Sequence, residues 1–236
     1  MTTLLEDLQS YQDKRKFPDW EPYASNANRK LDYSDGEQIV KSCLSFLDLE
    51  VSVGEWVKNA TEIPPEAKSF LLRNSSDEEK HTVALIHLLR YYRGARVSRY
   101  SKELIKRWNE IDVHPIVKAY ALECGVFFAV LPALTIYGDV YCATVSQWIN
   151  DDERVHVETN LRVIRELKLK LTEELLELVF ETVGYIFESL GEEKQIEQAS
   201  RAVKRVVRGR DAQMAKDSVP ITTAFFEQHD KRAIVY

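Results

Sequence analysis

The sequence contains few cysteines, glycines and prolines, and each scarcity narrows the class of protein. Its three cysteines, Cys43, Cys124 and Cys142, stand in apolar stretches, and none belongs to a Cys-x-x-Cys pair. They therefore provide no rubredoxin-like iron site, and we expect buried free thiols in a reducing compartment. The eight glycines and seven prolines form no linker, so a single domain is predicted.

The sequence has only one long apolar run, and its start does not look like a targeting segment. Only residues 119–138 raise the question of a membrane span, and Glu123, Gly125 and Pro132 interrupt them. We therefore interpret this run as a buried core helix and expect no membrane partner. The start of the chain has neither the basic nor the apolar segment of a signal peptide, which favours a cytoplasmic protein. The net charge of −6 argues against general binding of nucleic acid.

What the sequence does contain is one five-residue pattern twice: Asp-Glu-x-x-His occurs at 77–81 and again at 152–156. On a helix, positions i and i+3 share a face, so each copy directs a carboxylate and an imidazole toward one point. A single copy is equally compatible with an exposed acidic turn and a solvated histidine. Each of the five histidines has about one chance in ten of a glutamate three places earlier, so chance accounts poorly for two full copies.

The spacing of apolar residues predicts four long helices between residues 36 and 168. We expect them at 36–60, from Pro65 through Tyr92, at 114–137 and from Asp139, as the N-cap, to 168. A short amphipathic helix is expected within 96–110, and helices at 172–190 and 192–215 are expected to pack against the bundle. The ends of the chain, 1–35 and 219–236, show no clear period.

Two further glutamates lie in apolar stretches that are predicted to be buried, where an unpaired charge would destabilise the fold. Glu50 falls in the apolar stripe of the first predicted helix, and Glu123 is the only charged residue between positions 119 and 138. Glu50 and Glu78 have their midpoint at residue 64, and Glu123 and Glu153 have theirs at residue 138; the predicted turns lie at the same places. Each glutamate is thus roughly 21 to 23 Å from its turn, so the four can share one layer of a bundle.

This pattern resembles the ferritin-like di-iron carboxylate proteins, in which two helices each supply a glutamate and two others each supply Glu-x-x-His. The resemblance covers roughly residues 36–168. It implies an all-α fold in which an antiparallel four-helix bundle and additional C-terminal helices at about 172–216 form a single domain, 1–236. It implies two iron ions, with manganese as an alternative, because four carboxylates balance the charge of two divalent ions. The implied ligands are Glu50, Glu78, His81, Glu123, Glu153 and His156.

The resemblance also assigns roles to residues around the ligands. Asp77 and Asp152 look like acids that accept the outer N–H of the histidine in the opposite motif, which would fix its tautomer. Phe127, Phe128 and Leu131 are expected to line a substrate pocket; such a stripe is also compatible with ordinary core. The basic stretch 90–107 either docks an acidic partner, such as a ferredoxin electron donor, or is a solvated face. A homodimer is compatible with the sequence.

Within the superfamily, Ala121-Leu122-Glu123-Cys124 and the 28 residues between Glu50 and Glu78 look like the aldehyde-deformylating oxygenases. The 45 residues between Glu78 and Glu123 are nearer to bacterioferritin or rubrerythrin. Ribonucleotide reductase small subunits share the ligand plan, but Leu85 stands at the position of their radical tyrosine.

The implied function is that of an O₂-dependent oxidase or oxygenase of a small apolar substrate, with a fatty aldehyde as one candidate. The alternative is a ferroxidase or storage subunit; storage cages use shorter chains, so the extra C-terminal helices favour an enzyme. A metal-free scaffold is a third interpretation, and it leaves four core acids unexplained.

Overall fold

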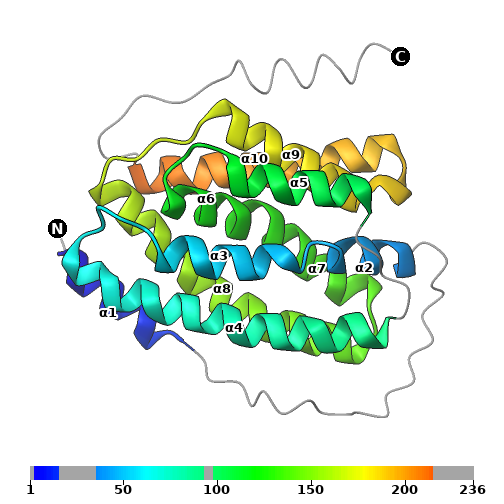
Figure 1. Cartoon of the computed structure of the whole chain (residues 1–236), viewed down its shortest axis with the longest axis horizontal. Helices are drawn as coiled ribbons and strands as arrows, with labels where there is room; N and C mark the ends of the chain where they lie inside the picture. Colours follow the sequence, from blue (N-terminus) through cyan, green and yellow to red (C-terminus); the bar gives the residue numbers. More distant parts are fainter. Residues whose placement is uncertain (1–2, 16–35, 93–97, 215–236) are drawn as a thin grey trace.

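The computed structural model of the chain describes residues 3–15, 36–92 and 98–214, and all regular structure within these ranges is helical (Figure 1). This confirms the predicted all-α class. The α-helices are α1 (Leu4–Asp13), α2 (Gly36–Leu44), α3 (Asp48–Lys58), α4 (Lys68–Tyr91), α5 (Arg99–Glu110), α6 (Pro115–Ala121), α7 (Phe128–Tyr137), α8 (Val140–Glu166), α9 (Glu173–Ile186) and α10 (Glu192–Met214). Three short helices of other types are η1 (Pro65–Ala67), η2 (Leu122–Phe127) and η3 (Glu188–Leu190).

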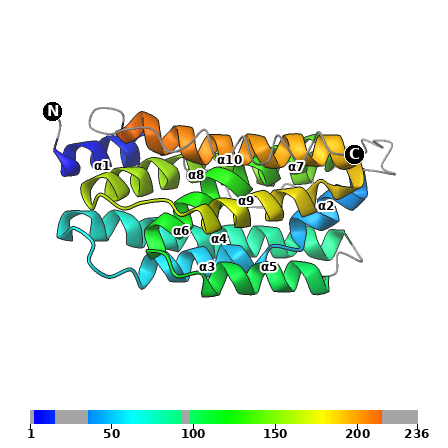
Figure 2. The ribbon, with the colours of Figure 1, turned by 90° about the horizontal axis from the view of Figure 1, so that it is seen from above.

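The long helices run along a common axis and form a bundle with an added layer (Figures 1 and 2). Helix α3 packs on α4, α4 on α8, α8 on α6 and α7, and α6 closes the ring against α3. Helices α9 and α10 pack on each other and cover η2, while α5 lies against α9 and α3. One continuous apolar core joins the bundle to the added layer.

The predicted helix starts are confirmed where the sequence carries a capping residue. Pro65 opens the short 3₁₀ turn η1 that leads into α4. Asp139 is the N-cap of α8, and its Oδ1 accepts from the backbone N–H of Cys142 at 2.8 Å. Thr172 caps α9 in the same way through Leu175.

The prediction of one continuous helix over 36–60 is wrong, because the helix is interrupted between α2 and α3. Ser45 donates its hydroxyl to the carbonyl of Ser42 at 2.6 Å, and the backbone N–H groups of Phe46 and Leu49 bond to carbonyls three residues earlier. Bonds of this spacing tighten the turn and redirect the helix. As a result α2 packs on α7, whereas α3 packs on α4.

The third predicted helix has the expected ends but not the expected pitch. Residues Leu122–Phe127 form the π-helix η2, so α6 and α7 are joined through a wider turn. From α10, Arg205 Nη1 donates to the carbonyl oxygens of Cys124 and Gly125 at 3.2 and 3.4 Å. A distant side chain thus satisfies carbonyl groups within the wider turn.

The segment Pro115–Tyr137 is the one helix of the described residues that is long and apolar enough to cross a membrane. Of its most apolar window, 78% is buried inside the protein, as predicted for a core helix. The cysteines are buried and free, also as predicted. Burial raises the pKa of Cys124 to about 11 and that of Cys142 to about 12, so both are thiols at neutral pH.

Helix α1 lies in a region for which the sequence predicted no regular structure. Thr3 and Glu6 form a capping box: the Thr3 hydroxyl accepts from the Glu6 N–H, and the Glu6 carboxylate accepts from the Thr3 N–H. The motif was legible in the sequence, but the helix is too short to show a clear period.

Replacing Gly125 with alanine tests how closely η2 packs on the added layer. A Cβ there would lie 2.8 Å from Val179 Cγ1 and 3.0 Å from Val206 Cγ2, which are stiff branched side chains. We expect Gly125→Ala to lower the free energy of unfolding by about 1 to 3 kcal/mol in urea titrations.

The control is Gly184→Ala in α9, where the nearest atom to a new Cβ is Gln195 Nε2 at 3.5 Å. Alanine is the better helix former, so this variant should be neutral or up to about 1 kcal/mol more stable. Equal effects of the two changes would contradict the close packing of η2.

Candidate metal centre

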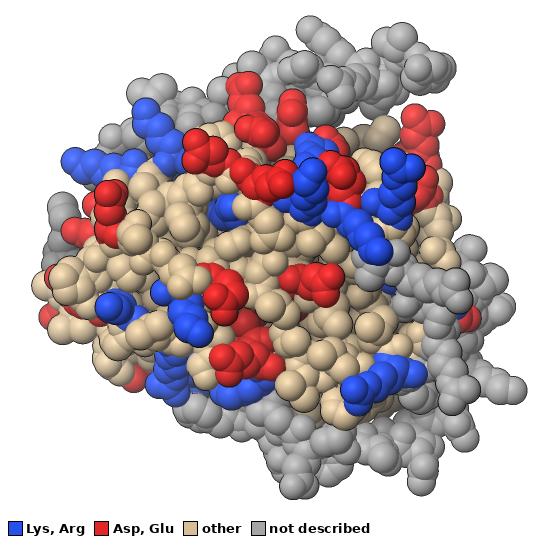
Figure 3. Space-filling model, viewed as in Figure 1, with Lys and Arg blue, Asp and Glu red and all other residues tan. Residues whose placement is uncertain are grey.

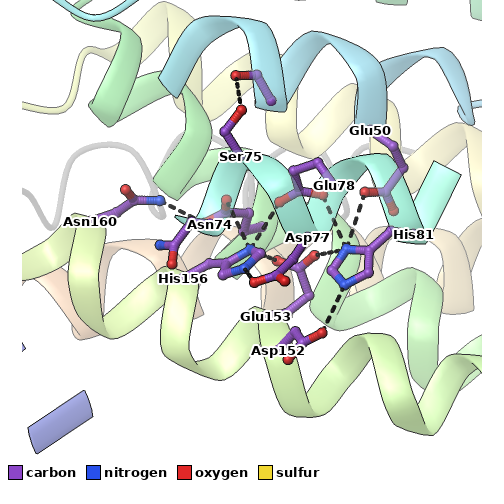
Figure 4. Close-up of polar contacts among 12 residues, drawn as sticks. Glu50, Asn74, Ser75, Asp77, Glu78, His81, Asp152, Glu153, His156 and Asn160 are labelled. Carbon is purple, nitrogen blue, oxygen red and sulfur yellow. Dashed lines mark hydrogen bonds and ion pairs between the residues drawn. The ribbon is translucent and has the colours of Figure 1, made fainter. Parts of the chain in front are cut away.

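All six residues predicted as ligands lie in one cluster at the centre of the bundle, and none is more than 2% exposed. Each comes from one of four neighbouring helical segments, and five of the six are labelled in Figure 4. Helix α3 supplies Glu50, α4 supplies Glu78 and His81, η2 supplies Glu123, and α8 supplies Glu153 and His156.

The donor atoms form two overlapping groups, and within each group all atoms lie within 4.8 Å of one another. One group contains Glu50 and His81, and the other contains Glu123 and His156; Glu78 and Glu153 belong to both. A carboxylate has two oxygens, so a shared glutamate can serve two ions at once. Each of the two groups could therefore hold a metal ion.

The two shared glutamates lie between the histidine rings. Glu78 Oε2 is 3.1 Å from His81 Nδ1, and Glu78 Oε1 is 2.9 Å from His156 Nδ1. Glu153 repeats the pattern, with Oε1 3.2 Å from the first ring nitrogen and Oε2 3.5 Å from the second. The ring centroids are 5.7 Å apart. The two halves of the cluster are thus related by an approximate twofold arrangement.

The outer nitrogen of each histidine faces the aspartate of the opposite motif. His81 Nε2 lies 3.3 Å from Asp152 Oδ2, and His156 Nε2 lies 3.4 Å from Asp77 Oδ2 (Figure 4). A carboxylate only accepts hydrogen bonds, so this contact places the proton of a neutral imidazole on Nε2. The Nδ1 lone pair then points to the centre of the cluster, as a metal ligand requires.

Several inward oxygens have no hydrogen bond of acceptable geometry. They are Glu50 Oε2, Glu78 Oε1 and both carboxylate oxygens of Glu153, all of them buried. Buried carboxylate oxygens are costly unless a cation or a proton neutralises them. This donor set therefore fits a pair of divalent cations.

Without a metal ion, the cluster must hold protons instead. Burial raises the pKa of Glu50 and of Glu123 well above the ordinary value, and the charge of Glu153 adds to the effect. Burial alone would lower the pKa of His81 and His156, but the neighbouring glutamates outweigh it and raise both well above the usual range.

Glu78 behaves in the opposite way. Burial raises its pKa, but the two histidines on either side outweigh this and hold the pKa below its usual range. Within the cluster, Glu78 is thus shifted in the opposite direction from Glu50 and Glu123.

A small apolar cavity of about 10 Å³ borders Glu50. Phe127 and Leu131 line it together with residues of α2 and with Leu85 of α4. Phe128 does not line this cavity, because it lies against the guanidinium of Arg205, 6.0 Å from the ring centroid. A volume of this size holds about one water-sized molecule.

The basic stretch predicted at 90–107 is partly neutralised within the chain. Arg107 forms an ion pair with Glu181, and Lys106 lies 3.8 Å from Glu110. Residues 93–97 lie outside the described residues. Figure 3 shows basic and acidic side chains interspersed over this face.

Two residues were missed in the sequence: one contacts the cluster itself, and the other contacts Asp77 beside it. Asn160 donates from Nδ2 to Glu123 Oε2 at 2.8 Å, and its place one helical turn after His156 could have indicated it. Arg15 pairs with Asp77 from the end of α1, and no spacing rule relates these two positions.

Comparison with known proteins adds no family to this geometry: no protein-family model matches the chain, and no curated protein matches it. The geometry and chemistry of the site are therefore what indicate its function.

The stability of the metal-free protein should fall as the pH rises. Glu50, Glu123, His81 and His156 all have raised pKa values in the folded chain, so it holds more protons than the unfolded chain above their ordinary pKa values of 4.5 and 6.5. In urea titrations with a chelator, we expect a loss between pH 6.5 and 8.5 of about 1.4 kcal/mol per pH unit for each histidine still protonated when folded. The lowered pKa of Glu78 matters only below pH 4.5.

The control is the same titration with excess Mn²⁺, which competes with these protons and should reduce or reverse the loss. Metal-free stability that stays constant or increases from pH 6.5 to 8.5 would contradict the proton-holding cluster.

Proposed function

We propose that the chain is a ferritin-like di-metal carboxylate protein that binds two iron or manganese ions and acts as an O₂-dependent oxidase or oxygenase. The observation that carries the proposal is the pair of overlapping donor groups that share Glu78 and Glu153. The contacts of His81 with Asp152 and of His156 with Asp77 also support the proposal, because each leaves an imidazole lone pair facing inward.

The residues would divide into two end groups and a shared middle. Glu50 and His81 would hold one ion, and Glu123 and His156 the other, with the two shared glutamates between them. Hard oxygen donors with some nitrogen suit iron and manganese, and the four carboxylates balance the charge of two divalent ions. When bound, such a pair would supply electrons to O₂, and a one-electron donor such as a ferredoxin would return the ions to the divalent state.

The protein's own contribution is orientation and exclusion of water. Asn160 fixes Glu123, and Asp77 and Asp152 fix the histidines, so the ligands are held before any ion arrives. Phe127 and Leu131 place an apolar wall beside Glu50, which keeps bulk water from that side of the centre.

Iron oxidation without an organic substrate is a second candidate, and the size of the cavity favours it. About 10 Å³ accommodates a small molecule such as O₂ but not the chain of a fatty aldehyde. A longer substrate would fit in this cavity only if its wall, to which α2 and α7 contribute, opened.

Metal analysis tests the proposal directly. Protein produced in iron-supplemented or manganese-supplemented medium should contain about two metal ions per chain. His81→Ala and His156→Ala should each lose at least one of them, because an inward-facing ligand is removed. His87→Ala is the matched control, since His87 is exposed on the same helix as His81 and should leave the content unchanged. A content well below two in both media would refute the proposal.

Oxygen uptake separates the two candidate functions. The anaerobic Fe²⁺ protein is exposed to O₂ in an oxygen electrode, first alone and then with excess Fe²⁺. Uptake that continues with each addition of Fe²⁺, with formation of a ferric product, identifies a ferroxidase. Uptake that stops after the bound ions are oxidised, and resumes only with a reductant, supports an oxidase or oxygenase.

A further inference from the structure

Arg15 is a charged residue buried beside the metal centre, and the proposed ligand set gives it no role. It follows the end of α1, and its side chain is only 2% exposed. One guanidinium nitrogen, Nη1, pairs with the carboxylate of Asp77, and the other, Nη2, donates to Asn74 Oδ1 at 2.7 Å. Asp77 in turn faces His156. A residue outside the bundle is thus two contacts away from an inward-facing histidine.

The burial of Arg15 requires an explanation, because an arginine side chain is rarely buried unless it is paired with an opposite charge. Asp77 has a second cationic partner, Lys80, whose Nζ lies 2.8 Å from Oδ1. The Lys80 side chain is 52% exposed and flexible, so it restrains the carboxylate weakly. The planar guanidinium of Arg15 is anchored at two points and is the better restraint.

Helix α1 itself is fixed to the bundle at another place. Arg162 of α8 donates from Nε to Asp7 Oδ2 at 2.7 Å, and it also pairs with Glu166. Helix α1 lies alongside α8 (Figure 2). The two arginines therefore both attach α1 to the bundle, but only the one at position 15 touches a residue that contacts the metal centre.

We propose that Arg15 is a positioning residue of the metal centre: it holds the Asp77 carboxylate against His156 Nε2 and thereby sets the metal affinity of the half of the centre formed by Glu123 and His156. Helix α1 then contributes to the metal centre, because it holds Arg15 in place. The inference rests on the proposed binding of two metal ions. Loss of a partner that orients a ligating histidine typically weakens metal binding by about 10-fold to 100-fold.

The test is a titration of the full chain with Mn²⁺ alone, in which the EPR signal of free Mn²⁺ reports how many ions are bound. Wild type should bind two ions. Arg15→Met should retain one site and weaken the other about 10-fold or more. Arg15→Lys should restore part of the affinity, because it returns the charge without the contact to Asn74. Arg162→Met should bind as wild type does, although it loosens α1.

Each result supports or overturns the inference. Wild type that binds neither Mn²⁺ nor Fe²⁺ refutes the proposed function. Wild type with two ions and Arg15→Met with equal affinity at both sites leaves that function standing and overturns the role of Arg15. Equal weakening by Arg162→Met also overturns it, because docking of α1 would then suffice.

A second variant covers the case in which Arg15→Met fails to fold, as judged by near-ultraviolet circular dichroism. Asp77→Asn keeps the size of the side chain and leaves the Arg162 attachment of α1 in place. It should weaken the same single site about 10-fold or more. Wild-type affinity in this variant would overturn the inference.

Discussion

The structure depends on one constraint: four glutamates and two histidines are buried together and must neutralise one another. Removing a single carboxylate from water costs several kcal/mol, so the members of the cluster depend on one another for neutralisation. Four helical segments supply these groups, and each must therefore be held in a fixed register with its neighbours. The alignment of α3, α4, η2 and α8 along the bundle is a consequence of this electrostatic requirement as much as of apolar packing.

The elements outside the four-helix ring act on the same cluster. Helix α10 reaches η2, the segment that carries Glu123, through Arg205. Helix α1 reaches Asp77 through Arg15. The added helices thus bury apolar surface and also fix the positions of groups that a bare bundle would leave free to rotate. The added layer therefore does more than enlarge the apolar core.

The centre of the site was predictable from the sequence because helical rise is constant. Equal distances from a turn place Glu50 level with Glu78, and Glu123 level with Glu153, without any knowledge of side-chain packing. Features that depend on competing hydrogen bonds were not predictable in this way. The break at Ser45 and the wider turn of η2 each replace the regular α-helical bond pattern by another one. Phe128 directly follows this wider turn and lies against Arg205 rather than in the cavity beside Glu50.

The wider turn of η2 also allows one helical segment to pack on different neighbours along its length. A helix of constant pitch presents a single stripe along its whole length. The segment from Pro115 to Tyr137 changes its pitch once, so it shifts phase midway. Before the shift it packs on α3 and α8; after it, on α8 and α2. Glu123 lies within the shift itself, where the chain leaves one phase and has not yet entered the next.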